Sequence, residues 1–178
     1  MYIWCALDLD RALCGIRRAA IEYNTRLRLS ELAFTLPQHL SLAISFEVED
    51  GAWREAVELI EHTAKDVPPP TLTPLGVERQ GDIIWIAFEK SEPLGRLHSL
   101  ILNDVKGELG IPPHTFDLDF RYHSTLFLGG DGAALSEMAE HLSKIALPQS
   151  LIADGYLIGI SESGRAGEYR VVRKIPSP

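Results

Sequence analysis

The pattern His-x-Ser/Thr occurs twice in this chain within stretches rich in β-forming residues, and it constrains how those stretches face the rest of the fold. The copies read QHLSL at residues 38–42 and YHSTL at residues 122–126. Successive side chains of a β-strand point to opposite faces. His39 therefore shares a face with Ser41, and His123 shares a face with Thr125. The other face of each strand is anchored by aliphatic residues, which are Leu40, Leu42 and Ile44 in the first copy and Leu126 and Leu128 in the second.

A third copy of the pattern, His141-Leu142-Ser143, serves as an internal control. It lies within residues 133–146, whose apolar spacing predicts a helix. Two residues along a helix differ by about 200° around its axis, so His141 and Ser143 point apart. The other three histidines lack a hydroxyl residue two positions on. Only the two strand-borne copies remain.

The predicted elements place these strands in two similar rounds, each leading from a histidine strand to a helix. Strands are expected over residues 2–9, 39–48, 71–77, 82–88, 116–128, 151–160 and 168–175, and helices from Asp10, from Gly51, from Pro93 and over residues 133–146. Gln80-Gly81 marks a hairpin turn. The pattern predicts an α+β protein with two pseudo-equivalent lobes around a central groove. No linker divides the chain, so residues 1–178 are expected to form one domain.

The composition is typical of a soluble globular protein, with 46% hydrophobic and 24% charged residues among 178. No apolar run approaches the roughly 18 residues of a membrane helix, and the N-terminus does not resemble a signal peptide. We therefore expect a cytoplasmic monomer that does not bind membranes. The net charge of −8 disfavours broad binding to duplex nucleic acid, which requires many Lys and Arg contacts to phosphates.

Two imidazoles and two hydroxyls indicate phosphodiester chemistry. One histidine activates the attacking oxygen as a base and the other protonates the leaving oxygen as an acid, because an imidazole serves either purpose near neutral pH. The hydroxyls of Ser41 and Thr125 bind the non-bridging phosphate oxygens. Geometry alone leaves open which histidine is the acid. No local His/Asp cluster has metal-binding spacing, so neither a metal nor another cofactor is predicted.

Three alternative interpretations stand beside this one. A histidine on an edge strand is often a solvated surface residue, although the pairing of two equivalent motifs argues against that explanation. A catalytically idle module that binds nucleotides or RNA termini would also keep a groove, but it would tolerate the loss of one imidazole. A metallohydrolase would use the histidines as ligands and would lose activity to a chelator.

The sequence resembles the two-histidine (2H) phosphoesterase superfamily, specifically its RNA 2′,3′-cyclic phosphodiesterase or 2′-5′ RNA ligase branch. Residues 4–9, 36–42, 120–126 and 167–171 carry this resemblance. It implies two antiparallel sheets flanking a groove, and hydrolysis of 2′,3′-cyclic phosphates to 2′-phosphates with weak reverse ligation in some members. It also implies that His39 donates a proton to the leaving 3′ oxygen and that His123 activates water. This chain departs from the family pattern at Tyr122, where proline is frequent, and at Ser124, where a bulky aliphatic residue is usual.

Two further residues are candidates for substrate binding because they share the face of His123. Arg121 lies two residues before it and is suited to a phosphate or a terminal nucleotide, or to a salt bridge on the surface. Phe127 lies two residues after Thr125 and either stacks a base or packs in the core. The expected substrate is a small nucleotide or an RNA 3′ terminus.

Overall fold

Two antiparallel sheets form the two lobes of the protein. The computed structural model describes residues 1–27, 29, 35–65, 67–130 and 132–177. Its strands are β1 (Tyr2–Asp8), β2 (His39–Ser41), β3 (Phe46–Glu47), β4 (Thr71–Leu72), β5 (Pro74–Gln80), β6 (Ile83–Phe88), β7 (His123–Leu128), β8 (Leu151–Ile152), β9 (Gly155–Ser161) and β10 (Arg170–Pro176). Its helices are α1 (Cys14–Leu27), α2 (Trp53–Ala64), α3 (Glu92–Leu100), the π-helical turn η2 (Ile101–Lys106), α4 (Thr115–Leu118) and α5 (Gly132–Ser143).

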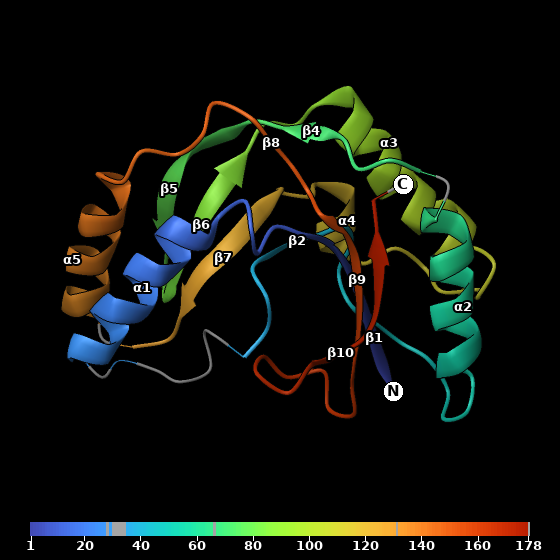
Figure 1. Cartoon of the computed structure of the whole chain (residues 1–178). Helices are drawn as coiled ribbons and strands as arrows, with labels where there is room; N and C mark the ends of the chain where they lie inside the picture. Colours follow the sequence, from blue (N-terminus) through green and yellow to red (C-terminus); the bar gives the residue numbers. More distant parts are fainter. Residues whose placement is uncertain (28, 30–34, 66, 131, 178) are drawn as a thin grey trace.

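The five-stranded lobe has the strand order β10-β9-β1-β2, with β3 also paired to β1, and the three-stranded lobe has the order β5-β6-β7. The short pair β4–β8 makes a third, two-stranded sheet. Helices α1 and α5 lie beside the three-stranded lobe, while α2 and α3 lie beside the five-stranded lobe (Figure 1). The predicted bilobal α+β architecture is thus confirmed.

Apolar burial joins the two lobes. A single cluster of buried residues runs from β1, β2 and β9 through α2 to β6 and β7. Strand β1 is buried along almost its whole length, as expected for a central strand with neighbours on both edges. Within the described ranges, no helix is long and apolar enough to cross a membrane.

Local sequence signals set several boundaries as predicted. Gly81 adopts a positive φ of 61° in the turn between β5 and β6, which glycine tolerates without strain. Helix α3 starts after Ser91, whose side chain accepts a hydrogen bond from the Leu94 amide at 3.4 Å, and Pro93 occupies its first turn.

Three of the wrong boundary predictions lie near the groove. Helix α1 begins at Cys14 instead of Asp10, because the Asp10 carboxylate binds the Gln38 amide and Arg17 and does not cap a helix. The strand predicted over residues 39–48 breaks after Ser41. The strand predicted over residues 116–128 begins only at His123, because α4 occupies residues 115–118.

Candidate active site

The two histidine motifs lie on β2 and β7, which belong to different sheets but approach each other at the centre of the molecule. Ser124 donates a hydrogen bond from Oγ to the backbone oxygen of His39 at 2.6 Å. Burial lowers the pKa of His39 most, and the charge of a protonated His123 lowers it further. The structure therefore brings together the two motifs, which are 84 residues apart in the sequence (123 − 39).

Both imidazoles are oriented by the same local contact. Nδ1 of His39 lies 2.7 Å from the backbone oxygen of Pro37, and Nδ1 of His123 lies 2.8 Å from that of Arg121. A carbonyl oxygen only accepts hydrogen bonds, so in each ring the proton of the neutral form resides on Nδ1. Each Nε2 then carries a lone pair that is available to take up a proton. This is the tautomer that an acid–base pair requires.

His39 lies in the more enclosed environment. Its ring meets Trp4 edge-on, with centroids 4.5 Å apart and planes at 79°. The Trp4 indole N–H donates to Ser41 Oγ at 2.9 Å, which leaves the Ser41 proton free to point elsewhere. Burial lowers the pKa of His39 to about 4 against the effect of its hydrogen bond to Pro37. In the free protein His39 is consequently neutral at pH 7.

Gly159 makes room for this arrangement. It lies opposite Trp4 in the β1–β9 ladder, and a Cβ atom at this position would come within 2.6 Å of the indole ring. Any side chain here would push Trp4 toward His39 and Ser41. The sequence carries no signal for this role of Gly159, because the requirement arises only from strand pairing.

His123 lies at a wider opening. Its ring tilts by 36° against Trp85 at a centroid distance of 4.6 Å. Burial lowers its pKa as well, against the effect of the hydrogen bond to Arg121. A cavity of about 570 Å³ adjoins it, lined by Arg121, Phe116 and apolar residues of β6. Among the residues that the structure describes, His123 lines this cavity and His39 does not.

Phe127 packs in the core, which is one of the two roles that the sequence left open for it. It is fully buried. The β6–β7 register pairs Ile84 with Phe127 and then Trp85 with Thr125, so Leu126 is an extra residue on β7. A β-bulge of this kind breaks the alternation of faces. His123 and Thr125 remain on the groove side, whereas Leu126 and Phe127 both turn into the core.

Phe116, and not Phe127, brings a phenylalanine ring to the cavity beside His123. Its side chain is 70% exposed and lines the cavity beside His123. It projects from α4, which begins with a reciprocal cap between His114 and Asp117. Histidine is not among the preferred N-cap residues, so this helix has no clear signal in the sequence. Ile44, expected on the core face of a longer strand, also lines the cavity, because β2 ends before it.

A buried network behind α4 holds these residues in place. The Lys106 ammonium, at the end of η2, donates to Asp117 at 2.7 Å, and both side chains are inaccessible to solvent. Asp117 also accepts hydrogen bonds from the amides of Ile44 and His114, each at 2.8 Å. Burial would raise the pKa of Asp117, but these hydrogen bonds outweigh it and hold the pKa below its ordinary value. The network ties α4 to the turn after β2.

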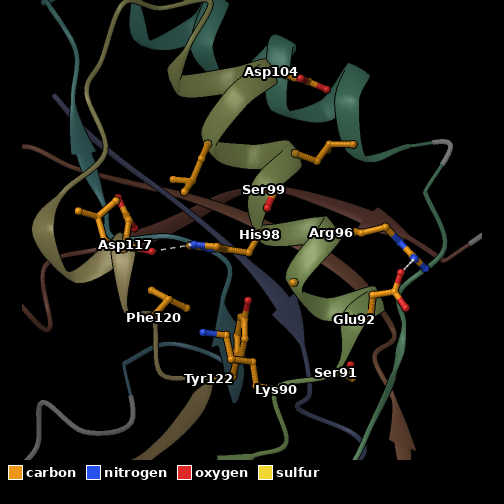
Figure 2. Close-up of a pocket in the computed structure, with 14 residues that line it drawn as sticks. Lys90, Ser91, Glu92, Arg96, His98, Ser99, Asp104, Asp117, Phe120 and Tyr122 are labelled. Atoms are coloured by element: carbon orange, nitrogen blue, oxygen red, sulfur yellow. Dashed lines mark hydrogen bonds and ion pairs between the residues drawn. The ribbon is translucent and has the colours of Figure 1, made fainter.

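A larger cavity lies beside α3 and borders Tyr122, the first residue of the second motif. It measures about 1020 Å³ and is lined by α3 together with residues such as Phe120 and Tyr122. Figure 2 shows His98 reaching across from α3 to Asp117. The two His98 nitrogens lie 2.6 Å and 3.1 Å from the backbone oxygens of Leu42 and Asp117. Neither His39 nor His123 lines this cavity. His98 thus joins α3 to the same turn and helix as the Lys106–Asp117 pair.

The family of the chain follows from a direct match. The model of the 2′-5′ RNA ligase superfamily matches residues 15–155, a span that includes both histidine motifs. The chain belongs to the 2′-5′ RNA ligase superfamily. The superfamily comprises 2H phosphoesterases and RNA ligases. This protein is therefore an enzyme that acts on phosphodiester bonds.

Solved structures agree on the fold. TT0787 of Thermus thermophilus is 20% identical with a TM-score of 0.62, over 99% of this chain and 98% of that one. LigT of E. coli, complexed with 3′-AMP, is 16% identical with a TM-score of 0.62, over 98% of this chain and 97% of that one. No curated protein matches the sequence significantly. Among the residues that the structure describes, there is no group of three or more His, Cys, Asp or Glu side chains that could hold a metal ion.

Proposed function

We propose that this protein is a metal-independent phosphodiesterase that hydrolyses 2′,3′-cyclic phosphates of RNA ends or small nucleotides to 2′-phosphates. The observation that carries the proposal is the convergence of two imidazoles from separate sheets, each with its proton held on Nδ1 and its Nε2 available. A single histidine would supply an acid or a base, but not both.

The proposed reaction assigns one role to each motif residue. Nε2 of His123 takes a proton from water as the water oxygen attacks phosphorus, and Nε2–H of His39 donates a proton to the 3′ oxygen as the P–O3′ bond breaks. The hydroxyls of Ser41 and Thr125 bind the non-bridging oxygens, on which charge accumulates. If the 5′-hydroxyl of a second RNA replaces water as the attacking group, the same steps break the P–O3′ bond and form a 2′-5′ phosphodiester. This ligation is expected to be weak in water.

His39 must gain a proton before it acts as the acid. Its pKa of about 4 in the free protein means that few molecules carry this proton at pH 7. A bound phosphodiester anion favours the charged imidazolium and raises the pKa. Substrate binding and protonation of His39 are therefore coupled in this mechanism.

The cavity beside His123 supports a nucleotide as the substrate. Phe116 offers an exposed aromatic face and Arg121 a guanidinium group at its edge, and stacking together with a charged hydrogen bond is a common way to bind a nucleotide. E. coli LigT, which shares the fold, binds 3′-AMP. The net charge of −8 favours a mononucleotide or the end of an RNA over a long duplex.

The test is incubation of the purified protein with 2′,3′-cyclic AMP in the presence of EDTA, with the product identified by ³¹P NMR. We expect 2′-AMP as the product and no effect of the chelator. Formation of 3′-AMP would reverse the assignment of the leaving oxygen, and loss of activity in EDTA would favour a metallohydrolase. Tight binding of the nucleotide without turnover would favour an idle binding module.

A further inference from the structure

A hydrogen-bonded bridge connects the two histidine motifs. Gln38, immediately before His39, donates from Nε2 to Ser124 Oγ at 2.6 Å and to the backbone oxygen of Thr125 at 2.7 Å. Ser124 in turn donates to the backbone oxygen of His39 at 2.6 Å. The Ser124 side chain is fully buried and that of Gln38 is 5% exposed. Gln38 and Ser124 are thus each adjacent in sequence to a motif histidine, and each bonds to the opposite motif.

The hydrogen bonds of this bridge allow only one assignment of donors and acceptors. The backbone oxygens of His39 and Thr125 accept but do not donate. Ser124 has one proton, which goes to His39, so its oxygen accepts from the Gln38 amide. The two amide protons of Gln38 are then both used, and the amide orientation is fixed. A buried network whose members are all paired in this way is rigid.

Gln38 is itself fixed from the side of β1. Its backbone N–H donates to the Asp10 carboxylate at 3.0 Å, and its backbone oxygen accepts from the backbone N–H of Leu9 at 2.9 Å. Arg17 binds Asp10 and donates to the backbone oxygen of Leu36 at 2.8 Å. The start of β2 is therefore held before the bridge to β7 is made.

This bridge replaces a backbone ladder. Strand β2 pairs only with β1, and β7 pairs only with β6, in the described structure. The local carbonyl contacts fix each imidazole relative to its own strand. In the described structure, the hydrogen bonds that join one motif to the other are those of Gln38 and Ser124.

We propose that Gln38 and Ser124 are positioning residues that set the separation of the His39 and His123 imidazoles; their importance for turnover rests on the function proposed above. Ser124 is the residue at which this chain departs from the bulky aliphatic residue usual in the family. A hydroxyl at this position both fits the buried site and bonds to the opposite motif, which an aliphatic side chain cannot do.

The kinetic test uses Ser124→Ala and Gln38→Met with 2′,3′-cyclic AMP. Each substitution removes part of the bridge and conserves most of the side-chain volume. We expect kcat to fall about 10- to 100-fold, as for small displacements of catalytic groups, with KM nearly unchanged. Because the two residues act as one unit, kcat of the double variant is expected to fall no further than that of the less active single variant.

The matched control is Ser161→Ala in β9. Ser161 is also buried, and its hydroxyl accepts hydrogen bonds from the amides of Ser163 and Gly164. Loss of this hydroxyl is expected to lower the thermal midpoint as Ser124→Ala does, but to leave kcat unchanged. A general loss of stability is thereby separated from a loss of position.

A measurement on the free protein separates this proposal from the proposed function. In ¹⁵N-histidine NMR titrations of the wild type, protonation of His123 is expected to shift the His39 resonances, and this mutual dependence is expected to weaken in both variants. If the wild type does not turn over cyclic phosphates, the proposed function fails and the NMR result alone decides the positioning role. The positioning role would be overturned if the variants gave the same titration curves as the wild type. It would also be overturned if the curves changed but kcat stayed at the wild-type value. Gln38→Met decides the question if Ser124→Ala does not fold.

Discussion

The two histidine motifs have the same local construction but different surroundings. In both, the ring is held by the carbonyl two residues earlier and lies against a tryptophan. His39 lies among Trp4, Ser41 and the central strand β1. After burial, its pKa depends on charged groups of the protein such as Arg17 and Asp8. His123 opens onto a cavity with Phe116 and Arg121 at its edge.

This difference indicates a division of tasks between the lobes. The five-stranded lobe supplies a histidine whose position and protonation the protein controls. The three-stranded lobe supplies a histidine beside the cavity in which we propose that the nucleotide binds. Substitutions around His39 should therefore alter kcat first, and those around the cavity should alter KM first.

Removal of either imidazole should have the largest effect. His39→Ala and His123→Ala are each expected to lower kcat/KM by a factor on the order of 10² to 10⁴, the usual contribution of a general acid or base. The control is His141→Ala, which removes the helical copy of the motif from α5 and should leave activity unchanged. Full activity in either of the first two variants would contradict the acid–base assignment.

The roles of the two histidines are distinguished by the leaving group. A p-nitrophenyl phosphodiester releases a stable anion and needs little help from an acid. On this substrate the loss caused by His39→Ala should shrink to about 10-fold, while that caused by His123→Ala should persist. Recovery of the His123 variant in place of the His39 variant would exchange the two labels.

The hydroxyls should have intermediate effects. Ser41→Ala and Thr125→Val are each expected to lower kcat/KM about 10-fold, because each removes a hydrogen bond to the charged phosphate. Ser41→Ala also leaves the Trp4 indole N–H without its acceptor, so its thermal midpoint should fall more than that of Thr125→Val. Steady-state kinetics and thermal unfolding of both variants measure the two effects.

Phe116→Ala should weaken substrate binding without affecting the chemical step. Loss of one base-stacking contact of roughly 1–3 kcal/mol corresponds to a rise in KM of about 5- to 150-fold, with kcat retained. Leu118→Ala is the matched control, since Leu118 is similarly exposed on the same helix but lies at the other cavity. An equal rise in KM in both variants would show that α4 acts as a whole and that Phe116 makes no specific contact.

The smallest expected effect is the dependence of the wild-type rate on pH near neutrality. Free enzyme with one proton shared between the histidines is most abundant between their pKa values, which lie at about 4 for His39 and below 6.5 for His123. The profile of kcat/KM should therefore peak on the acidic side of neutrality and fall as the pH rises. The peak of kcat should lie higher, because the bound phosphate stabilises the imidazolium. A kcat/KM maximum above pH 7 would contradict this.

Alternation along a strand was sufficient to predict which residues of each motif share a face. Leu40, Leu42 and Leu126 are buried as predicted. The same rule failed at Phe127, because a bulge depends on the pairing of β7 with β6 and leaves no mark in the sequence of β7 alone. It also offered no indication of the bridge, since Gln38 and Ser124 are 86 positions apart and each, taken separately, is an ordinary polar residue.

Helix α4 was missed for a related reason. Its start depends on a cap between His114 and Asp117, and its position depends on Lys106 from a π-helical turn. Neither dependence is a local propensity of residues 115–118. A short helix held by a buried ion pair has to be observed in the structure.

The bulge in β7 divides that strand into a segment constrained by chemistry and a segment constrained only by packing. Up to Thr125, any shift in register would turn His123 and Thr125 away from the groove. Beyond the bulge, Leu126 and Phe127 are both buried in the core. Over evolutionary time the far end of the strand is therefore free to exchange one apolar residue for another while the near end stays fixed, and the core of this lobe can drift without altering its chemistry.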